Sequence, residues 1–224
     1  RLIPLFERSF KKGIIYLSEC SIQAEAYDYQ IAIGSLPQFF RNHEENFKKR
    51  NTHYLQSDPR KSNILRNKLK VSKNKKIVGI SWESTSKLNK HKSIALEEFV
   101  KGIYSEEICL LNLQYGNTND QINHIKEKFN IEIIDIAEID LYNNIDDLAS
   151  LISACDYIVS IDNVTAILAG AISSNCQLLL QTNSHWYWGI NDITSYWFSS
   201  IKLYRQNDKQ GWNAAFKDVK NILI

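Results

Sequence analysis

The sequence lacks most of the short motifs that identify common nucleotide-dependent enzymes. It contains no G-x-G-x-x-G and no phosphate-loop motif, which argues against a dehydrogenase and a phosphate-loop NTPase. A D-x-D motif, G-x-S-x-G, H-E-x-x-H and the Tyr-x-x-x-Lys pair expected of a nucleotide-sugar epimerase are also missing. Any bound phosphate must therefore be held by helix N–H groups and side chains.

An excess of one charge and long apolar runs are lacking too. Lys and Arg number 27 against 25 Asp and Glu, and this formal charge of +2 is too balanced to favour nucleic acid or a membrane surface as the main partner. Apolar runs such as Ile108–Leu113 are far shorter than the ~20 residues of a membrane span. No signal peptide opens the chain, and the absence of an initiator methionine before Arg1 indicates a piece of a longer protein.

The four cysteines form no C-x-x-C motif and no Cys/His pair. Most stand in or beside apolar runs, where a buried free thiol is usual. We therefore expect a reducing, cytoplasmic setting.

From about residue 73 onward, apolar strands alternate with amphipathic helices. This alternation predicts an α/β fold with a Rossmann-like parallel sheet, covered on both faces and doubly wound. The expected strands are Ile77–Trp82, Ile108–Gln114, Glu132–Ile136, Tyr157–Ile161, Gln177–Gln181 and Ser200–Tyr204. The expected helices between and after them are Ser93–Tyr104, Asp120–Phe129, Asn144–Ala154, Thr165–Ser173 and Gly211–Leu223.

The first part of the chain does not complete such a pattern. It offers helical segments at Leu2–Phe10, Leu36–Arg41 and Asp58–Leu69, and strand-like segments at Ile14–Leu17 and Tyr29–Ile33. A basic stretch, residues 70–76, follows as an exposed linker. We predict a partial N-terminal α/β lobe over residues 1–72 and a C-terminal Rossmann-like domain over residues 73–224.

Ligands of open parallel sheets bind beyond the carboxyl ends of the strands, where the strand order reverses. In the expected order this point lies between the loop that follows Ser81 and Trp82 and the loop Asp162–Thr165. Asp162 or Asn163 can cap the next helix, so that the free N–H groups of Val164 and Thr165 form an anion site. A second interpretation fits equally well, in which these residues only cap and pack.

Two further groups of residues are candidates for a binding role. Lys87, Lys90, His91 and Lys92 cluster after the first strand and could reach a diphosphate, although such a loop is commonly only solvated. The run from His185 to Gly189 belongs to a tryptophan-rich tail that either lines a cleft or packs between lobes. The adjacent Asp146 and Asp147 are interpreted as a charge complement to a helix N-terminus.

The order and spacing of several segments resemble the heptosyltransferase group of GT-B glycosyltransferases, specifically the glycosyltransferase-like domains that follow tetratricopeptide repeats. The resemblance covers most of the chain but no single segment is decisive. The segments are Pro4–Arg8, Asp28–Pro37, Tyr54–Pro59, Val78–Trp82, Leu113–Gly116, Asp147–Ala154, Asp162–Gly170 and Leu203–Gln206.

This resemblance implies two Rossmann-like lobes with a cleft between them and a metal-independent transfer from a nucleotide-diphosphate sugar, without a further cofactor. Gly34 and Ser35 would face the cleft from the acceptor side. The donor positions implied or suggested above are Ser81, Trp82, Lys87, Lys90, Gln114, Tyr115, Asp162, Asn163, Val164 and Thr165.

The chain departs from the family pattern at two places. The pattern D-x-x-x-x-H-L-A-G has Ile167 at the histidine position, and the first strands of the N-terminal lobe, which usually carry the catalytic base, are not found. We therefore expect a glycosyltransferase, or the donor-binding part of one, with an unassigned saccharide or protein acceptor. The alternative is a non-catalytic binding module that keeps the fold, favoured by Ile167.

Overall fold

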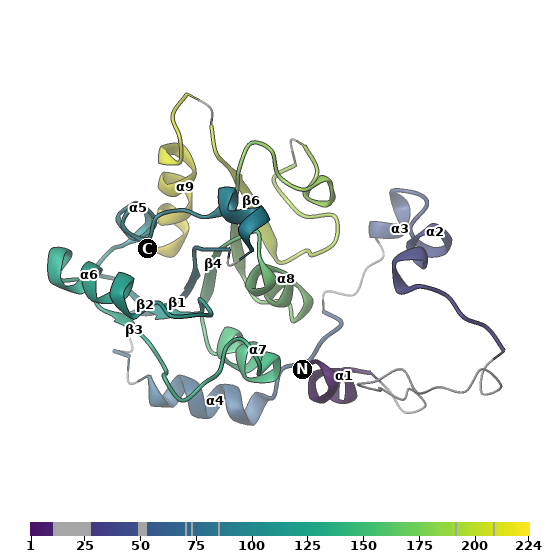
Figure 1. Ribbon diagram of the computed structural model, residues 1–224, viewed down its shortest axis with the longest axis horizontal. Coiled ribbons are helices and arrows are strands. Elements are labelled where there is room, and N and C mark those ends of the chain that lie inside the picture. The colour runs from purple at the N-terminus through teal and green to yellow at the C-terminus, as the bar shows by residue number, and fades with distance from the viewer. Residues whose placement is uncertain are drawn as a thin grey trace.

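The computed structural model describes residues 1–10, 28–48, 53–69, 71–72, 74–84, 86–190, 192–207 and 209–224. Its centre is a six-stranded sheet in the order β3-β2-β1-β4-β5-β6, and every neighbouring pair is parallel. The predicted α/β class and doubly wound order are confirmed (Figure 1). The strands are β1 (Lys76–Ser81), β2 (Ile108–Asn112), β3 (Ile133–Ile134), β4 (Tyr157–Ile161), β5 (Cys176–Leu180) and β6 (Ile201–Arg205).

The strand order reverses between β1 and β4, which lie side by side at the middle of the sheet. Val78 pairs with Tyr157, and Ser81 at the end of β1 pairs with Ser160 near the end of β4. Because all strands run the same way, their carboxyl ends open on one edge, as predicted. β3 is shorter than the predicted Glu132–Ile136, in keeping with its place at the edge of the sheet, with only one neighbouring strand.

Helices cover both faces of the sheet and bury a separate apolar layer on each (Figure 1). One layer is formed with α4 (Pro59–Lys68), α7 (Ile145–Ser153) and α8 (Val164–Ala171). The other is formed with α5 (Leu96–Ile103), α6 (Asn119–Phe129) and α9 (Asn213–Leu223). Apolar side chains alternate between the two layers along β1, where Ile77 joins the first and Val78 the second.

The short helix α1 (Ile3–Ser9) and α4 are fastened to α7 by charge. Arg8 pairs with Asp146 and Lys61 pairs with Asp147. Arg66 Nη2, on α4, also lies 2.7 Å from Asp156 Oδ1. Asp146 and Asp147 therefore do more than complement the charge of the α7 N-terminus, because they also hold α1 and α4 against α7.

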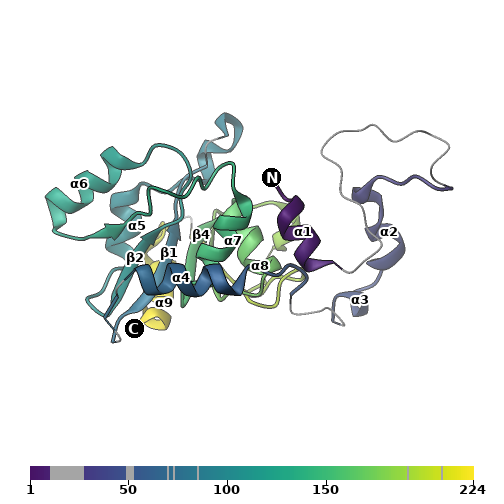
Figure 2. The same ribbon diagram turned by 90° about the horizontal axis from the view of Figure 1, so that it is seen from below.

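The rest of the described N-terminal part lies to one side, beyond α1 and α8 (Figures 1 and 2). It contains η2 (Ile33–Ser35), α2 (Pro37–Phe40) and α3 (Glu45–Lys48). The predicted strand Tyr29–Ile33 is wrong, since these residues are irregular up to η2 and expose Tyr29, Ile31 and Ile33. The predicted strand Ile14–Leu17 lies outside the described residues.

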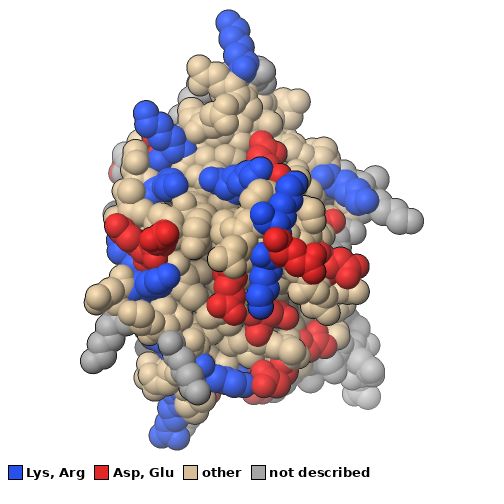
Figure 3. Space-filling model, turned by 90° about the vertical axis from the view of Figure 1, so that its left-hand side faces the viewer, with Lys and Arg blue, Asp and Glu red and all other residues tan. Residues whose placement is uncertain are grey.

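The distribution of charge and the apolarity of the helices both bear on possible partners. On the face shown in Figure 3, basic and acidic side chains are interspersed without a broad area of one sign. Within the described ranges, we find no helix with the length and apolarity that crossing a membrane requires.

The approach of Phe198 to Gly170 of α8 makes this glycine a sensitive test of the packing. A Cβ atom at Gly170 would lie 2.5 Å from Phe198 Cγ and 2.8 Å from Ile201 Cδ1. We expect Gly170→Ala to lower the free energy of unfolding by about 1–2 kcal/mol, because overpacking outweighs the better helix propensity of alanine. Denaturant unfolding measures this change.

The matched control is Gly34→Ala, because nothing lies within 4 Å of a Cβ atom at that position. This variant should unfold within about 0.5 kcal/mol of the parent chain. Equal unfolding midpoints for the two variants would contradict the packing of Phe198 on α8.

Candidate functional site

A buried hydrogen-bond network occupies the carboxyl ends of β1, β2 and β4. Asn163 Nδ2 donates to Ser81 Oγ over 2.7 Å, and Ser81 Oγ donates to Gln114 Oε1 over 3.0 Å. Gln114 Oε1 also accepts from the backbone N–H groups of Trp82 and Glu83, at 3.1 and 2.9 Å. Ser81 and Gln114 are almost fully buried, so these two predicted donor residues connect the ends of the strands beneath the surface of the edge.

Trp82 is fully buried beside this network. Its Nε1 donates to Gln121 Oε1 over 2.8 Å, and its ring belongs to the apolar layer with α5 and α9. The side chain therefore supports the crevice from below and offers little surface to a ligand.

The N-terminus of α8 meets this network at Asn163, as predicted. Asn163 Oδ1 accepts from the Thr165 N–H over 3.0 Å and from Ser160 Oγ over 3.1 Å. Val164 is 40% exposed, whereas Thr165 is fully buried. Within the described part of the chain, Thr165 Oγ1 has no hydrogen-bond partner.

Asp162 stands beside this helix end and is contacted from two other loops. Lys92 Nζ lies 2.7 Å from Asp162 Oδ2, and both side chains are largely buried, at 12% and 7% exposed. Tyr187 Oη donates to Asp162 Oδ1 over 3.1 Å, and His185 Nε2 lies 3.8 Å from Asp162 Oδ2. Burial and the neighbouring Asp162 carboxylate raise the pKa of the Tyr187 hydroxyl, which keeps it a neutral donor.

The loop that carries His185 and Tyr187 is fixed by Arg205 at the end of β6. Arg205 Nη1 donates to Ser184 Oγ over 2.7 Å, and Nη2 donates to the carbonyls of Trp188 and Gly189 at 2.8 and 3.0 Å. Gly189 has a φ of +71°, which favours glycine, and a Cβ atom there would collide with Asp192. The aromatic segment is thus held on both sides of η4 (Trp186–Trp188).

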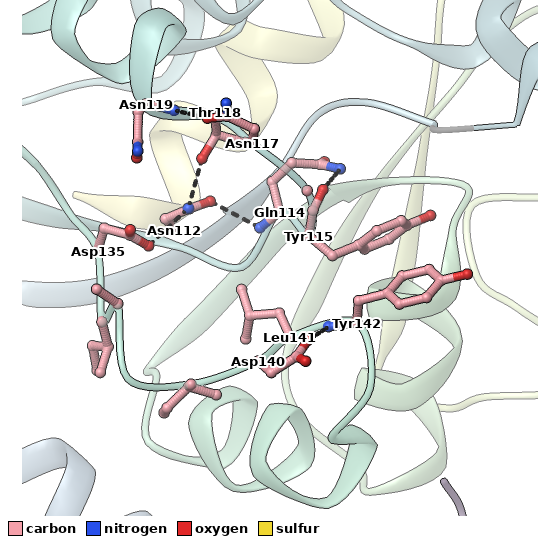
Figure 4. Close-up of a pocket in the computed structure, with 14 residues that line it drawn as sticks. Asn112, Gln114, Tyr115, Asn117, Thr118, Asn119, Asp135, Asp140, Leu141 and Tyr142 are labelled. Atoms are coloured by element: carbon pink, nitrogen blue, oxygen red, sulfur yellow. Dashed lines mark hydrogen bonds between the residues drawn. The ribbon is translucent and has the colours of Figure 1, made fainter.

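A pocket of about 480 Å³ lies beyond the carboxyl ends of β2 and β3 (Figure 4). The rings of Tyr115 and Tyr142 stand 5.9 Å apart at its side. Asn112 Nδ2 donates to Thr118 Oγ1 and Asp135 Oδ1 within it, at 3.1 and 2.9 Å. Gln114 lines the pocket as well as the network, so the two are adjoining parts of one edge.

The structure brings together most of the predicted donor residues, but not Lys87 and Lys90, nor the predicted acceptor-side residues Gly34 and Ser35. Lys90 is exposed on η3 (Lys87–Lys92), and the side chain of Lys87 is not among those described. Gly34 and Ser35 lie apart from Asp162, on the segment that leads into α2 and packs near Trp197 and Phe198. Phe198 adjoins Gly170 at the C-terminal end of α8, whereas Asp162 precedes the N-terminal end.

Several residues of the site were not singled out from the sequence. Lys92 was one of several lysines in its loop, and His185 and Tyr187 were part of a tail with two interpretations. Asp135 and Tyr142 both lie in the segment between β3 and α7 and belong to no motif. The sequence marks them only by their position after the carboxyl end of a strand.

Among the described residues, no group of three or more His, Cys, Asp or Glu side chains is placed to hold a metal ion. The polar groups around Asp162 are a lysine, a tyrosine hydroxyl and an imidazole, and the adjoining pocket adds amides and the carboxylates of Asp135 and Asp140. Such a set offers hydrogen bonds of both kinds to a polar ligand.

Comparison with known proteins gives one relative by sequence. The chain is 29% identical over 241 residues to "Protein FlbA" of Caulobacter vibrioides, covering 100% of this chain and 39% of that protein. The chain thus spans well under half of the relative's length. No protein-family model matches the chain.

Two solved structures share the architecture. A glycosyl transferase of family 9 from Veillonella parvula matches with a TM-score of 0.53 at 8% identity, over 70% of this chain and 44% of that one. The ADP-heptose heptosyltransferase II of Escherichia coli matches with a TM-score of 0.51 at 17% identity, over 75% and 50%. The chain therefore has the Rossmann-like fold of a GT-B glycosyltransferase domain.

Proposed function

We propose that this chain binds a nucleotide-diphosphate sugar at the carboxyl edge of its sheet and forms the donor-binding part of a glycosyltransferase. The observation that carries the proposal is the continuity of the edge. A hydrogen-bonded chain from Gln114 through Ser81 to Asn163 connects the polar pocket to the N-terminus of α8. A single ligand can therefore span both places.

The dimensions of the edge fit a nucleoside diphosphate. The pocket lies beyond β2, and α8 follows β4, two strand spacings away. This separation is about 10 Å, comparable with the reach from a base through ribose to a diphosphate. The base would lie by Gln114 and beside the rings of Tyr115 and Tyr142.

The diphosphate would lie at the N-terminus of α8, beside the partly exposed Val164. The helix end contributes about half a positive charge, and Lys92 neutralises the neighbouring Asp162 carboxylate, which would otherwise repel the phosphates. The sugar would then extend toward the loop of His185 and Trp186, where an acceptor, a saccharide or a protein, could approach.

The shared fold and the adjoining pocket favour transfer chemistry, while Ile167 favours a binding-only module. Ile167 is partly buried and packs against the apolar layer with α7 and α8, so it offers no polar group to a ligand. Incubation with ADP-, GDP-, UDP- and CDP-sugars separates the two functions. Release of nucleoside diphosphate supports the transferase, and binding without release supports the module.

Removing the charge of Lys92 should weaken diphosphate binding. Lys92→Gln keeps a hydrogen-bond donor beside Asp162 but leaves the negative charge of that carboxylate uncompensated next to the phosphates, a change comparable with losing one charge-assisted hydrogen bond of about 1.5–3 kcal/mol. We expect UDP, GDP, ADP or CDP, whichever binds the parent chain, to bind about tenfold or more weakly. Isothermal calorimetry measures the dissociation constants.

The control for this variant is Lys101→Ala, an exposed lysine of α5 that pairs with Glu97 over 2.7 Å. It should leave nucleotide affinity unchanged. The donor-site proposal is wrong if no nucleoside diphosphate at millimolar concentration binds the parent chain or raises its melting temperature.

Shortening Tyr115 should weaken binding of the base without affecting the phosphates. Aromatic stacking contributes about 1–3 kcal/mol per base, so Tyr115→Ala should bind nucleoside diphosphates about tenfold more weakly. Inorganic pyrophosphate should bind this variant as it binds the parent chain. Tyr29→Ala, at a ring that is 93% exposed on the N-terminal segment, is the matched control. Equal losses for pyrophosphate and nucleotide would place the base elsewhere.

A further inference from the structure

We propose that His185 is a phosphate-binding residue of this site, and that its imidazole provides a hydrogen-bond donor which the Lys92–Asp162 pair does not supply. The inference rests on the proposed donor site and assigns a role within it. It follows from the way two loops converge on Asp162 at the N-terminus of α8.

The first step is the charge of the helix itself. The segment Val164–Ala171 contains no basic and no acidic residue. Its N-terminus offers N–H groups and a partial dipole charge, which together fall short of the two negative charges of a nucleotide-diphosphate sugar. Further stabilisation of the phosphates must come from side chains of other loops.

Lys92 alone does not supply this stabilisation. Its ammonium group lies 2.7 Å from the Asp162 carboxylate, and the two largely buried groups cancel. Arg205 is nearby but donates to Ser184, Trp188 and Gly189 and is used to hold the loop. Among the described residues of this cluster, His185 is the one whose ring nitrogen has no short hydrogen bond to Asp162 and can contact the ligand.

The imidazole is placed to meet a ligand. Its ring stacks on Tyr187, with centroids 5.3 Å apart and planes inclined by 21°, so its orientation is set by a side chain that itself donates to Asp162. Its Nε2 lies 3.8 Å from Asp162 Oδ2, beyond hydrogen-bond length, and its side chain is 45% exposed. A phosphate oxygen can therefore reach this N–H group without displacing a short hydrogen bond to the carboxylate.

The partners of Asp162 leave the imidazole to the ligand. The Asp162 carboxylate lies against Lys92 at one oxygen and accepts from Tyr187 at the other. His185 therefore adds a donor at the edge of this cluster, and removing it should weaken phosphate binding without breaking the Lys92–Asp162 pair.

The test compares His185→Gln and His185→Ala with the parent chain by calorimetry. The probes are ADP-glucose, UDP-glucose, GDP-mannose and CDP-glucose. We expect about tenfold weaker binding by His185→Ala and a smaller loss by His185→Gln, whose amide can still donate a hydrogen bond. His124→Ala is the control, since His124 is a 56% exposed histidine of α6 that lies 3.5 Å from Glu97.

The outcomes separate this inference from the function on which it rests. If no probe binds the parent chain, the donor site itself fails and the inference with it. If a probe binds the parent and both His185 variants equally, only the role of His185 is overturned. Equal melting temperatures of the variants and the parent exclude a loss of folding.

Discussion

The side chain of Asn163 is the contact on which the rest of the site depends. One amide group accepts from Thr165 N–H and Ser160 Oγ and donates to Ser81 Oγ. It thereby fixes the start of α8, the end of β4 and the end of β1 relative to one another. Breaking such a buried arrangement leaves polar groups unpaired, each at a cost of about 1–3 kcal/mol.

Gln114 extends this constraint to the third strand. Its carbonyl oxygen accepts from a hydroxyl and two backbone N–H groups, so the loop after β1 is held open next to the pocket beyond β2. The crevice is therefore preorganised by groups that a ligand need not touch. A preformed polar edge of this kind lowers the ordering cost of binding, because the start of α8 is already fixed by the Asn163 cap.

The fold could be predicted from the sequence because its signals are local and repeated. Apolar strands such as Tyr157–Ile161 and caps such as Asn144, which accepts from Asp147 N–H over 3.0 Å, depend on a few neighbouring residues. The point where the strand order reverses could be predicted from the expected order of the strands. The positions of Ser81, Asn163 and Thr165 at that point could be predicted with it. Their roles were harder to predict, since whether an amide turns inward or toward a ligand depends on its partners in space.

The remaining parts of the site depend on contacts between distant segments. Lys92 reaches Asp162 across 70 residues, and Arg205 holds a loop 16 to 21 residues earlier in the chain. Pairings between distant residues leave no periodic pattern in the sequence. Lys92 is one of four basic residues in its loop, and nothing in the sequence separates it from the other three. The predicted strand Tyr29–Ile33 is wrong for a related reason, because strand propensity alone does not supply a neighbouring strand to pair with.

The pairing of β1 with β4 also determines when the crevice can come into existence. Val78 and Tyr157 are about 80 residues apart in the chain, and everything between them forms the β2–β3 half of the sheet. During synthesis, therefore, β1 and its loop emerge long before their partners. The nucleotide edge is assembled only when β4 and α8 have left the ribosome, and a chain truncated before Asn163 can retain a half-sheet but has no crevice.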